Sequence, residues 1–153
     1  MKKYVCTIDQ GTTSTRFMIF DKSGDVVAFD QMEHRQIYPY SGWVEHDPLE
    51  IIEKTLKVII GGLAKSGIEI SEISGIGITN QRETTVLWDK TTGKPYYNAI
   101  VWQDVRTDDM CRELNRTYGE RIREKTGLPV NTYFSASKIK WIIDNIPQVK
   151  KDL

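Results

Sequence analysis

The segment Val5-Cys6-Thr7-Ile8-Asp9-Gln10-Gly11-Thr12-Thr13-Ser14-Thr15-Arg16-Phe17-Met18-Ile19-Phe20 decides the fold, because two apolar runs enclose a short polar loop. The apolar runs, residues 4–8 and 17–20, are typical of strands that are covered on both faces. A turn signal at residues 21–25 leads into a third apolar run at residues 26–29. The start of the chain therefore predicts a three-stranded antiparallel meander.

The polar loop of this segment combines an acid, a glycine, several hydroxyls and a fixed positive charge. Asp9 follows the first strand, where a carboxylate could hold a hydrated Mg²⁺, and Gly11 leaves space for ligand oxygens to approach the backbone. Hydroxyls, successive main-chain N–H groups and one guanidinium make up the rest, at Thr12, Thr13, Ser14, Thr15 and Arg16. Two interpretations stay open: the loop is an anion nest that binds phosphate, or it is an ordinary polar hairpin turn whose hydroxyls satisfy the turn. Neither a G-x-x-x-x-G-K-[ST] nor a G-x-G-x-x-G pattern occurs here.

One long helix is predicted between Asp47 and Gly67. Asp47 can cap its start, Pro48 suits the first turn and Glu50 completes a capping box, while Gly67 can end the helix in the left-handed conformation. Apolar residues recur at helical spacing and predict a single buried face, formed by Leu49, Ile52, Leu56, Ile59, Ile60 and Leu63.

The remaining chain predicts short strands followed by helices. The expected strands are residues 73–79, 84–88 and 99–102, and the expected helices are about residues 107–117, 119–125 and 135–146. In the first of these strands, Gly75 and Gly77 leave one face bare, so that a helix could pack closely there. The order of elements indicates an α/β domain with a mixed sheet.

Composition narrows the classes of function. The 153 residues suffice for one domain with a core but not for two full lobes around a cleft. Lys plus Arg and Asp plus Glu number 21 each, and no basic stripe suggests nucleic acid. The start, Met1-Lys2-Lys3, has no signal-peptide pattern, and no apolar run reaches membrane-spanning length, so we expect a cytoplasmic protein without a membrane partner. Cys6 and Cys111 are expected to be buried thiols, and His34 and His46 to be structural or surface residues rather than ligands.

Polar residues follow three of the predicted strands, at residues 9–16, 80–83 and 103–106. In open α/β sheets ligands bind outside the carboxyl ends of the strands, so these polar groups are expected to converge on one site. Adjacent residues of a strand point to opposite faces. If Arg82 and Glu83 both reach one ligand, the backbone must therefore leave strand geometry by Gln81.

Several of these motifs resemble a known family. Residues 9–14 (DQGTTS) resemble the first phosphate loop of the sugar-kinase, hexokinase and actin-like fold. Residues 42–48 (GWVEHDP), 77–85 (GITNQRETT) and 98–103 (NAIVWQ) resemble the glycerol kinases within the FGGY family of carbohydrate kinases. The resemblance extends from Tyr4 to about Ile146. It implies an incomplete α/β domain of the ribonuclease H-like class, as in the actin and hexokinase-like ATPases, in which a mixed sheet starts with the meander.

The resemblance also implies roles for the matching positions. Arg82, Glu83 and Tyr133 would bind the hydroxyls of glycerol, and Trp102 would form the apolar wall of that pocket. The positions facing the phosphates of ATP or ADP would be Gly11, Thr12, Thr13, Ser14 and Arg16, and Asp9 would place Mg²⁺. Structural interpretations stay open beside these roles: a surface ion pair for Arg82 and Glu83, a core aromatic for Trp102, and plain packing for Tyr133.

The resemblance covers only the first part of such a kinase. Residues 1–153 are expected to be the N-terminal part of the N-terminal domain, without the second, nucleotide-binding lobe or the later aspartate that acts as the catalytic base. The full-length enzyme would phosphorylate glycerol with ATP as a homo-oligomer. The alternatives are a kinase for another polyol and a catalytically silent fragment that at most binds polyols or a partner. A domain cut in mid-sequence is expected to expose an apolar patch or a bare sheet edge.

Overall fold

The computed structural model describes residues 3–152, which form two compact units. Unit 1 contains the described residues up to Arg35 together with residues 49–81, and unit 2 contains residues 36–48 and the described residues from Arg82 onward. The chain thus passes from unit 1 to unit 2 and back before it enters unit 2 for the last time.

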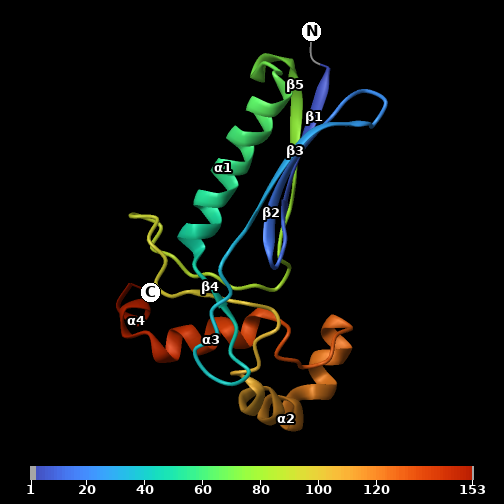
Figure 1. Cartoon of the computed structure of the whole chain (residues 1–153). Coiled ribbons are helices and arrows are strands. Elements are labelled where there is room, and N and C mark those ends of the chain that lie inside the picture. The colour runs from blue at the N-terminus through green and yellow to red at the C-terminus, as the bar shows by residue number, and fades with distance from the viewer. Residues whose placement is uncertain (1–2, 153) are drawn as a thin grey trace. The chain divides into compact units, whose positions relative to one another are not determined.

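Unit 1 is built on a four-stranded mixed sheet whose order is β3-β2-β1-β5 (Figure 1). β1 (Tyr4–Gln10), β2 (Ser14–Phe20) and β3 (Val26–Glu33) pair antiparallel, which confirms the predicted meander. β5 (Ile73–Thr79), which follows the short 3₁₀ helix η1 (Ile70–Glu72), pairs parallel with β1. The predicted mixed α/β sheet is therefore present.

The helix α1 (Pro48–Ser66) lies along one face of this sheet. Two glycines let it approach closely, because a Cβ atom at Gly62 would lie 2.6 Å from the Phe17 ring and one at Gly61 would lie 1.9 Å from the Asp30 carboxylate. The core between helix and sheet consists of Cys6, Ile8, Phe17, Ile19 and Val58. Gly67 ends the helix in the left-handed conformation, as predicted.

The predicted buried face of α1 is partly wrong. Val58, which was not assigned to that face, is fully buried, while Ile59 and Leu63 are only partly buried against the core. The other assigned residues, Leu49, Ile52, Leu56 and Ile60, are between 55% and 67% exposed. The apolar face of α1 is wider than the contact of the helix with the sheet. Only the residues along one side of that face are therefore buried.

Two isoleucines on β5 are also exposed, Ile76 by 54% and Ile78 by 74%. Their register partners on β1 are Cys6 and Ile8, which are buried on the face covered by α1, so the isoleucines point to that same face. β5 pairs with β1 alone among the described strands and is an edge of the sheet. We call Leu49, Ile52, Leu56, Ile60, Ile76 and Ile78 the apolar surface. The predicted exposed patch and bare edge are both present.

Unit 2 contains a two-stranded sheet and three helices. β4 (Glu45–His46) pairs antiparallel with β6 (Ala99–Ile100), and the helices are α2 (Asp108–Thr126), α3 (Ser135–Asn145) and α4 (Pro147–Asp152). Their core centres on Ile100, Ile142 and Val149. No helix within residues 3–152 is long and apolar enough to cross a membrane.

Three predictions for unit 2 need correction. The expected strand at residues 84–88 is present only as isolated bridges at Thr85 and Trp88. The two expected helices after Thr107 form the single helix α2, which continues through Gly119. Pro147 ends α3 as predicted, but it also starts α4, which was not predicted.

Candidate functional site

The predicted phosphate loop is a tight hairpin in unit 1. β1 extends to Gln10 and β2 begins at Ser14, so only residues 11–13 lie between the strands. The N–H of Gly11 donates to the carbonyl of Ser14 at 3.0 Å, and a Cβ at Gly11 would meet that oxygen at 3.1 Å. The turn itself therefore requires a small residue at position 11.

The strand register divides the polar groups between the two faces of the sheet. Gln10 pairs with Thr15 on the face covered by α1, where the buried Thr15 hydroxyl donates to the Gln10 amide oxygen at 2.8 Å. Thr55 on α1 donates to the same oxygen at 3.0 Å. The Thr15 hydroxyl therefore satisfies a group within the fold, as the structural interpretation of the loop hydroxyls predicts.

Asp9 and Arg16 are paired across the strands on the other face. Gln31 on β3 extends this row: its amide oxygen accepts from Arg16 Nε at 3.0 Å, and its amide nitrogen donates to the Ser14 hydroxyl at 2.9 Å. Within residues 3–152 the Asp9 carboxylate has no hydrogen bond or ion pair. Gln31 was missed because its role depends on the register of β3, which local sequence does not show.

His34 braces the hairpin from the end of β3. Its ring Nε2 lies 2.9 Å from the carbonyl oxygen of Thr12, and its main-chain N–H donates to the carbonyl of Thr13 at 3.2 Å. The ring is 5% exposed, and burial lowers its pKa below the ordinary value of 6.5. The neutral ring with its proton on Nε2 therefore donates to Thr12, which confirms a structural role for this histidine.

The predicted polyol-binding residues lie in unit 2, and their backbone follows the geometry expected from the sequence. β5 ends at Thr79, and Arg82 and Glu83 form a turn. Glu83 has a φ of 65°, a left-handed conformation that no other non-glycine residue of the described chain adopts. Such a residue costs on the order of 1–3 kcal/mol and persists where its surroundings fix it, often at a binding site.

The carboxylate of Glu83 is held by the start of α3. Its Oε2 accepts from the main-chain N–H of Ser135 at 2.8 Å and from the Ser135 hydroxyl at 2.7 Å. A carboxylate at a helix N-terminus is favoured because the unpaired N–H groups carry partial positive charge. Within the described chain Oε1 has no bond, so it keeps its capacity to accept from a ligand hydroxyl.

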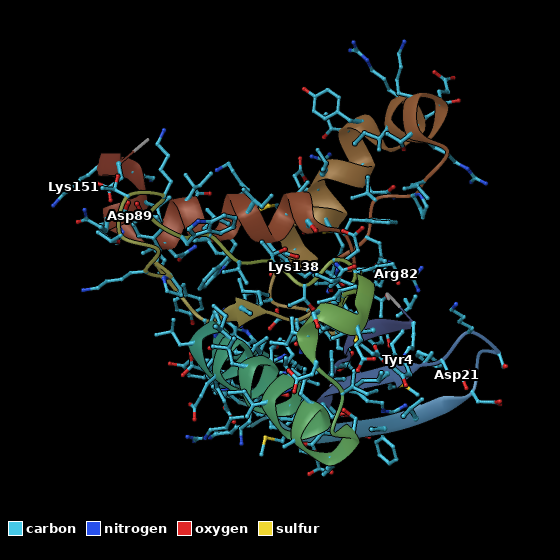
Figure 2. The ribbon with its side chains drawn as sticks, turned by 90° about the horizontal axis from the view of Figure 1, so that it is seen from above. Tyr4, Asp21, Arg82, Asp89, Lys138 and Lys151 are labelled. Atoms are coloured by element: carbon cyan, nitrogen blue, oxygen red, sulfur yellow. The ribbon has the colours of Figure 1, made fainter. Side chains whose placement is uncertain are left out.

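Two aromatic residues, Trp102 and Tyr133, lie on segments that are connected to Glu83. The Trp102 and Tyr133 rings contact each other edge to face with their centroids 5.9 Å apart, and Tyr133 makes a similar contact with Phe134 at 5.3 Å. The main-chain N–H of Trp102 donates to the Thr84 hydroxyl at 3.3 Å. The structure thus links Trp102 to the residue after Glu83, and Tyr133 lies two residues before Ser135. Arg82, labelled in Figure 2, is exposed and has no hydrogen bond or ion pair within residues 3–152.

The segment that carries Tyr133 is itself braced. Asn131 accepts from the N–H of Tyr133 through its side chain at 2.8 Å and from the N–H of Phe134 through its carbonyl at 3.2 Å. Lys138, on the first turns of α3, donates from Nζ to the carbonyls of Tyr133 and Phe134 at 2.5 and 3.2 Å. Ser135 and Lys138 were missed because a serine or lysine at a helix start is ordinary in sequence.

In the third predicted group of ligand-facing residues, 103–106, Asp104 and Arg106 have structural roles. Arg106 bonds both oxygens of Asp104 and the Glu45 carboxylate, at 2.7–2.9 Å, and all three side chains are buried. The guanidinium also stacks on the Trp43 ring, 3.8 Å from its centroid. These groups satisfy one another and leave no acceptor for a substrate.

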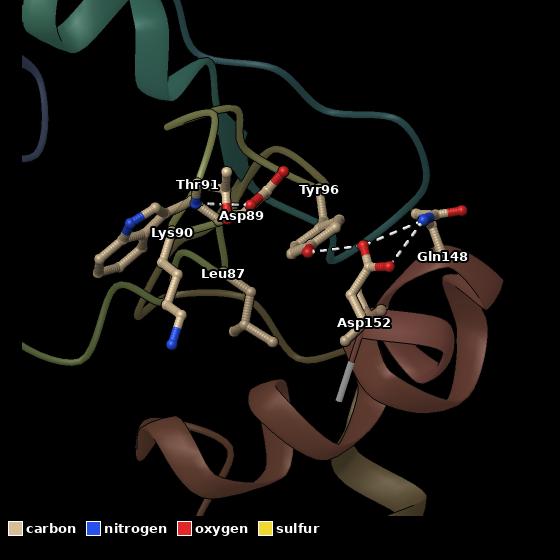
Figure 3. A pocket seen from close by; sticks show the side chains of 9 residues that line it. Leu87, Asp89, Lys90, Thr91, Tyr96, Gln148 and Asp152 are labelled. Carbon is tan, nitrogen blue, oxygen red and sulfur yellow. Dashed lines mark hydrogen bonds between the residues drawn. The ribbon is translucent and has the colours of Figure 1, made fainter.

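Unit 2 has two larger hollows. One, of about 360 Å³, is mostly apolar and includes Glu83 and Phe134 in its lining. The other, of about 760 Å³, lies between residues 87–96 and α4 and contains none of the predicted site residues (Figure 3). There Tyr96 donates to Asp152 at 2.8 Å, which raises the pKa of Tyr96 to about 12.

The sequence matches the model of the FGGY family of carbohydrate kinases, N-terminal domain, over residues 4–153. It is 64% identical over 152 residues to the glycerol kinase of Roseiflexus sp. and 62% identical over 151 residues to that of Saccharopolyspora erythraea. These alignments cover 99% and 98% of this chain, which spans about 30% of the length of either relative.

Solved structures agree. The Plasmodium falciparum glycerol kinase with ADP has a TM-score of 0.89 at 40% identity, covering 97% of this chain and 30% of the other. The xylulose kinase from Rhodospirillum rubrum has a TM-score of 0.88 at 26% identity, covering 99% of this chain and 32% of the other. The predicted fold and family resemblance are thus both confirmed, and the chain belongs to the FGGY family of carbohydrate kinases.

Proposed function

We propose that this chain supplies the polyol-binding residues and the phosphate-facing hairpin of an ATP-dependent glycerol kinase, which forms sn-glycerol 3-phosphate and ADP. The 64% identity to the Roseiflexus glycerol kinase over nearly the whole chain carries the proposal. The pentulose kinase of similar fold is only 26% identical, so the identity favours glycerol over a pentulose.

In this proposal glycerol is bound through its hydroxyl groups. Glu83 accepts from one or two hydroxyls with the oxygen that Ser135 leaves unused, and the exposed Arg82 donates to a neighbouring hydroxyl. Tyr133 adds a further bond, and the Trp102 ring packs against the carbon chain. Such a site rejects alcohols that lack a hydroxyl, since its own polar groups would be left unpaired.

The hairpin of unit 1 faces the phosphates of ATP in this proposal. The main-chain N–H groups of residues 12 and 13, the hydroxyls of residues 12–14 and the guanidinium of Arg16 bind phosphate oxygens, and Gly11 leaves room for these oxygens to approach. Mg²⁺ fits Asp9, because this cation takes few carboxylates and keeps several waters, and Asp9 has no other partner in the described chain. The cation would neutralise charge on the transferred group, which is most of what phosphoryl transfer requires of its site.

The complete kinase would also need a second lobe for adenosine and an aspartate to act as the general base. We assign both to the part of such a kinase that this chain does not cover, since the chain spans about 30% of its relatives' length. The purified chain alone is therefore expected to show no glycerol-dependent ATP turnover. Formation of glycerol 3-phosphate by purified residues 1–153 in a coupled assay would contradict this division of roles.

A hybrid kinase tests the proposed activity directly. In it, residues 1–153 of this chain replace the matching N-terminal part of the Roseiflexus glycerol kinase. We expect the hybrid kinase to phosphorylate glycerol with a KM within about tenfold of its parent, and xylulose and gluconate at least about 100-fold less efficiently. A folded hybrid that turns over neither glycerol nor another polyol would refute the proposal, and a preference for xylulose would move it to another substrate.

A further inference from the structure

Lys138 is a buried cation in an unfavourable place. Its side chain is fully buried, although it lies in the first turns of α3, where the helix end already carries partial positive charge. Burying an ammonium group is costly unless it is paired and hydrogen-bonded. Burial lowers the pKa of Lys138 from 10.5 to about 8. The contacts that compensate this cost therefore indicate what the side chain is for.

Two kinds of contact compensate it. The ammonium group donates to the carbonyls of Tyr133 and Phe134, which lie directly before α3. Its charge is also opposed by carboxylates, because Glu83 and Asp104 both act to raise its pKa, as does the thiol of Cys111 to a smaller extent. Asp104 is already paired with Arg106, whereas the Glu83 carboxylate is bound by the main-chain N–H and hydroxyl of Ser135, in the segment that Lys138 holds.

These contacts join the two sides of the polyol-binding residues. The carbonyls held by Lys138 belong to the segment that presents the Tyr133 ring to Trp102 and the two Ser135 donors to Glu83. We propose that Lys138 is a positioning residue for the polyol pocket, which it sets by fixing residues 133–135, the segment whose Ser135 holds the Glu83 carboxylate. This inference rests on the proposed function.

The experiment compares two lysines of α3 in the hybrid kinase. Lys138→Met keeps the apolar stem and removes the donors, whereas Lys140→Met changes an exposed lysine that pairs with Asp144. We expect Lys138→Met to raise the KM for glycerol by about tenfold or more, because small misplacements of binding groups have effects of this size. The KM for ATP should stay within about twofold, and Lys140→Met should change neither.

A purely structural role would give a different result. It would lower the melting temperature of Lys138→Met and the amount of active enzyme, but leave the glycerol KM of the folded fraction within about twofold, and that outcome would overturn the inference. If Lys138→Met does not fold, Lys138→Gln, which keeps an N–H donor, should raise the glycerol KM by a smaller factor than the one expected for Lys138→Met. An unchanged glycerol KM in Lys138→Gln would also overturn the inference. An inactive unsubstituted hybrid would instead count against the proposed function.

A double-mutant cycle adds a sharper readout. Because Lys138 is proposed to act through Glu83, Lys138→Met should raise the glycerol KM less in a Glu83→Gln background than in the unsubstituted hybrid kinase. Fully multiplicative effects of the two substitutions would show that the side chains act independently, and would overturn the proposed action of Lys138 on Glu83 through residues 133–135.

Discussion

At the scale of single residues, Glu83 carries the most specific argument. Its left-handed backbone and its two bonds from Ser135 fix one carboxylate oxygen and leave the other without a partner in the described chain. Hydrogen bonds to charged groups contribute about 1.5–3 kcal/mol. Glu83→Gln in the hybrid kinase should therefore raise the glycerol KM roughly 10- to 100-fold. Glu120→Gln, on the exposed part of α2, is the matched control, and equal KM values for both variants would refute the role.

His34 gives a prediction about pH. Burial lowers the pKa of its ring below 6.5, the ordinary value that applies to the unfolded chain. Between the two pKa values the unfolded state binds the extra proton, so the free energy of unfolding decreases as the pH falls below about 6.5. His34→Gln keeps an N–H donor for Thr12 but does not titrate. Urea unfolding of the chain at pH 7, 6 and 5 should show the unsubstituted protein losing stability relative to this variant, and a constant difference would contradict the assignment.

The sequence predicted the position of some candidate site residues, but not the residues that hold them in place. Arg82 and Glu83 could be assigned because polar residues directly follow an apolar strand, and the expected break in the backbone before them is present. Lys138 and Gln31 could not, because a lysine in a helix and a glutamine in a strand look like surface residues until tertiary contacts bury or pair them. Supporting contacts of this kind connect residues far apart in sequence, so no local pattern identifies them.

At the scale of elements, the errors share one physical cause. Periodicity located α1 correctly, but packing against β1 and β2 decided which margin of its apolar stripe is buried. Gly119 suggested a break, yet a glycine in a helix interior costs only about 1 kcal/mol, which the rest of α2 overcomes. The apolar residues 84–88 suggested a strand, but only single bridges form there. Local propensity gave the kind of element, and tertiary contacts set its extent and its buried face.

The buried ion network ties the small elements of unit 2 together. Arg106 contacts Asp104, which follows β6, and Glu45 on β4, and all three side chains are buried. Removing one partner leaves a buried carboxylate without its counter-charge, which typically costs about 3–5 kcal/mol. Arg106→Met should therefore lower the free energy of unfolding in urea by about that amount. Arg112→Met, at an exposed ion pair with Asp108, should lower it by less than about 1 kcal/mol. Equal losses of unfolding free energy in the two variants would show that the buried network contributes no more than an exposed ion pair.

At the scale of the whole molecule, the apolar surface of unit 1 is the feature with a physical consequence. Four of its six residues lie on α1 and two lie on β5, an edge strand whose outer N–H and C=O groups are unpaired within the described chain. Such surfaces favour association. The purified chain is therefore expected to self-associate with rising concentration in sedimentation velocity. Leu56→Glu should shift it toward monomer, whereas Lys57→Gln, which lowers the net charge by the same amount on the same helix, should not. A monomer at all concentrations, or equal effects of the two substitutions, would contradict the prediction.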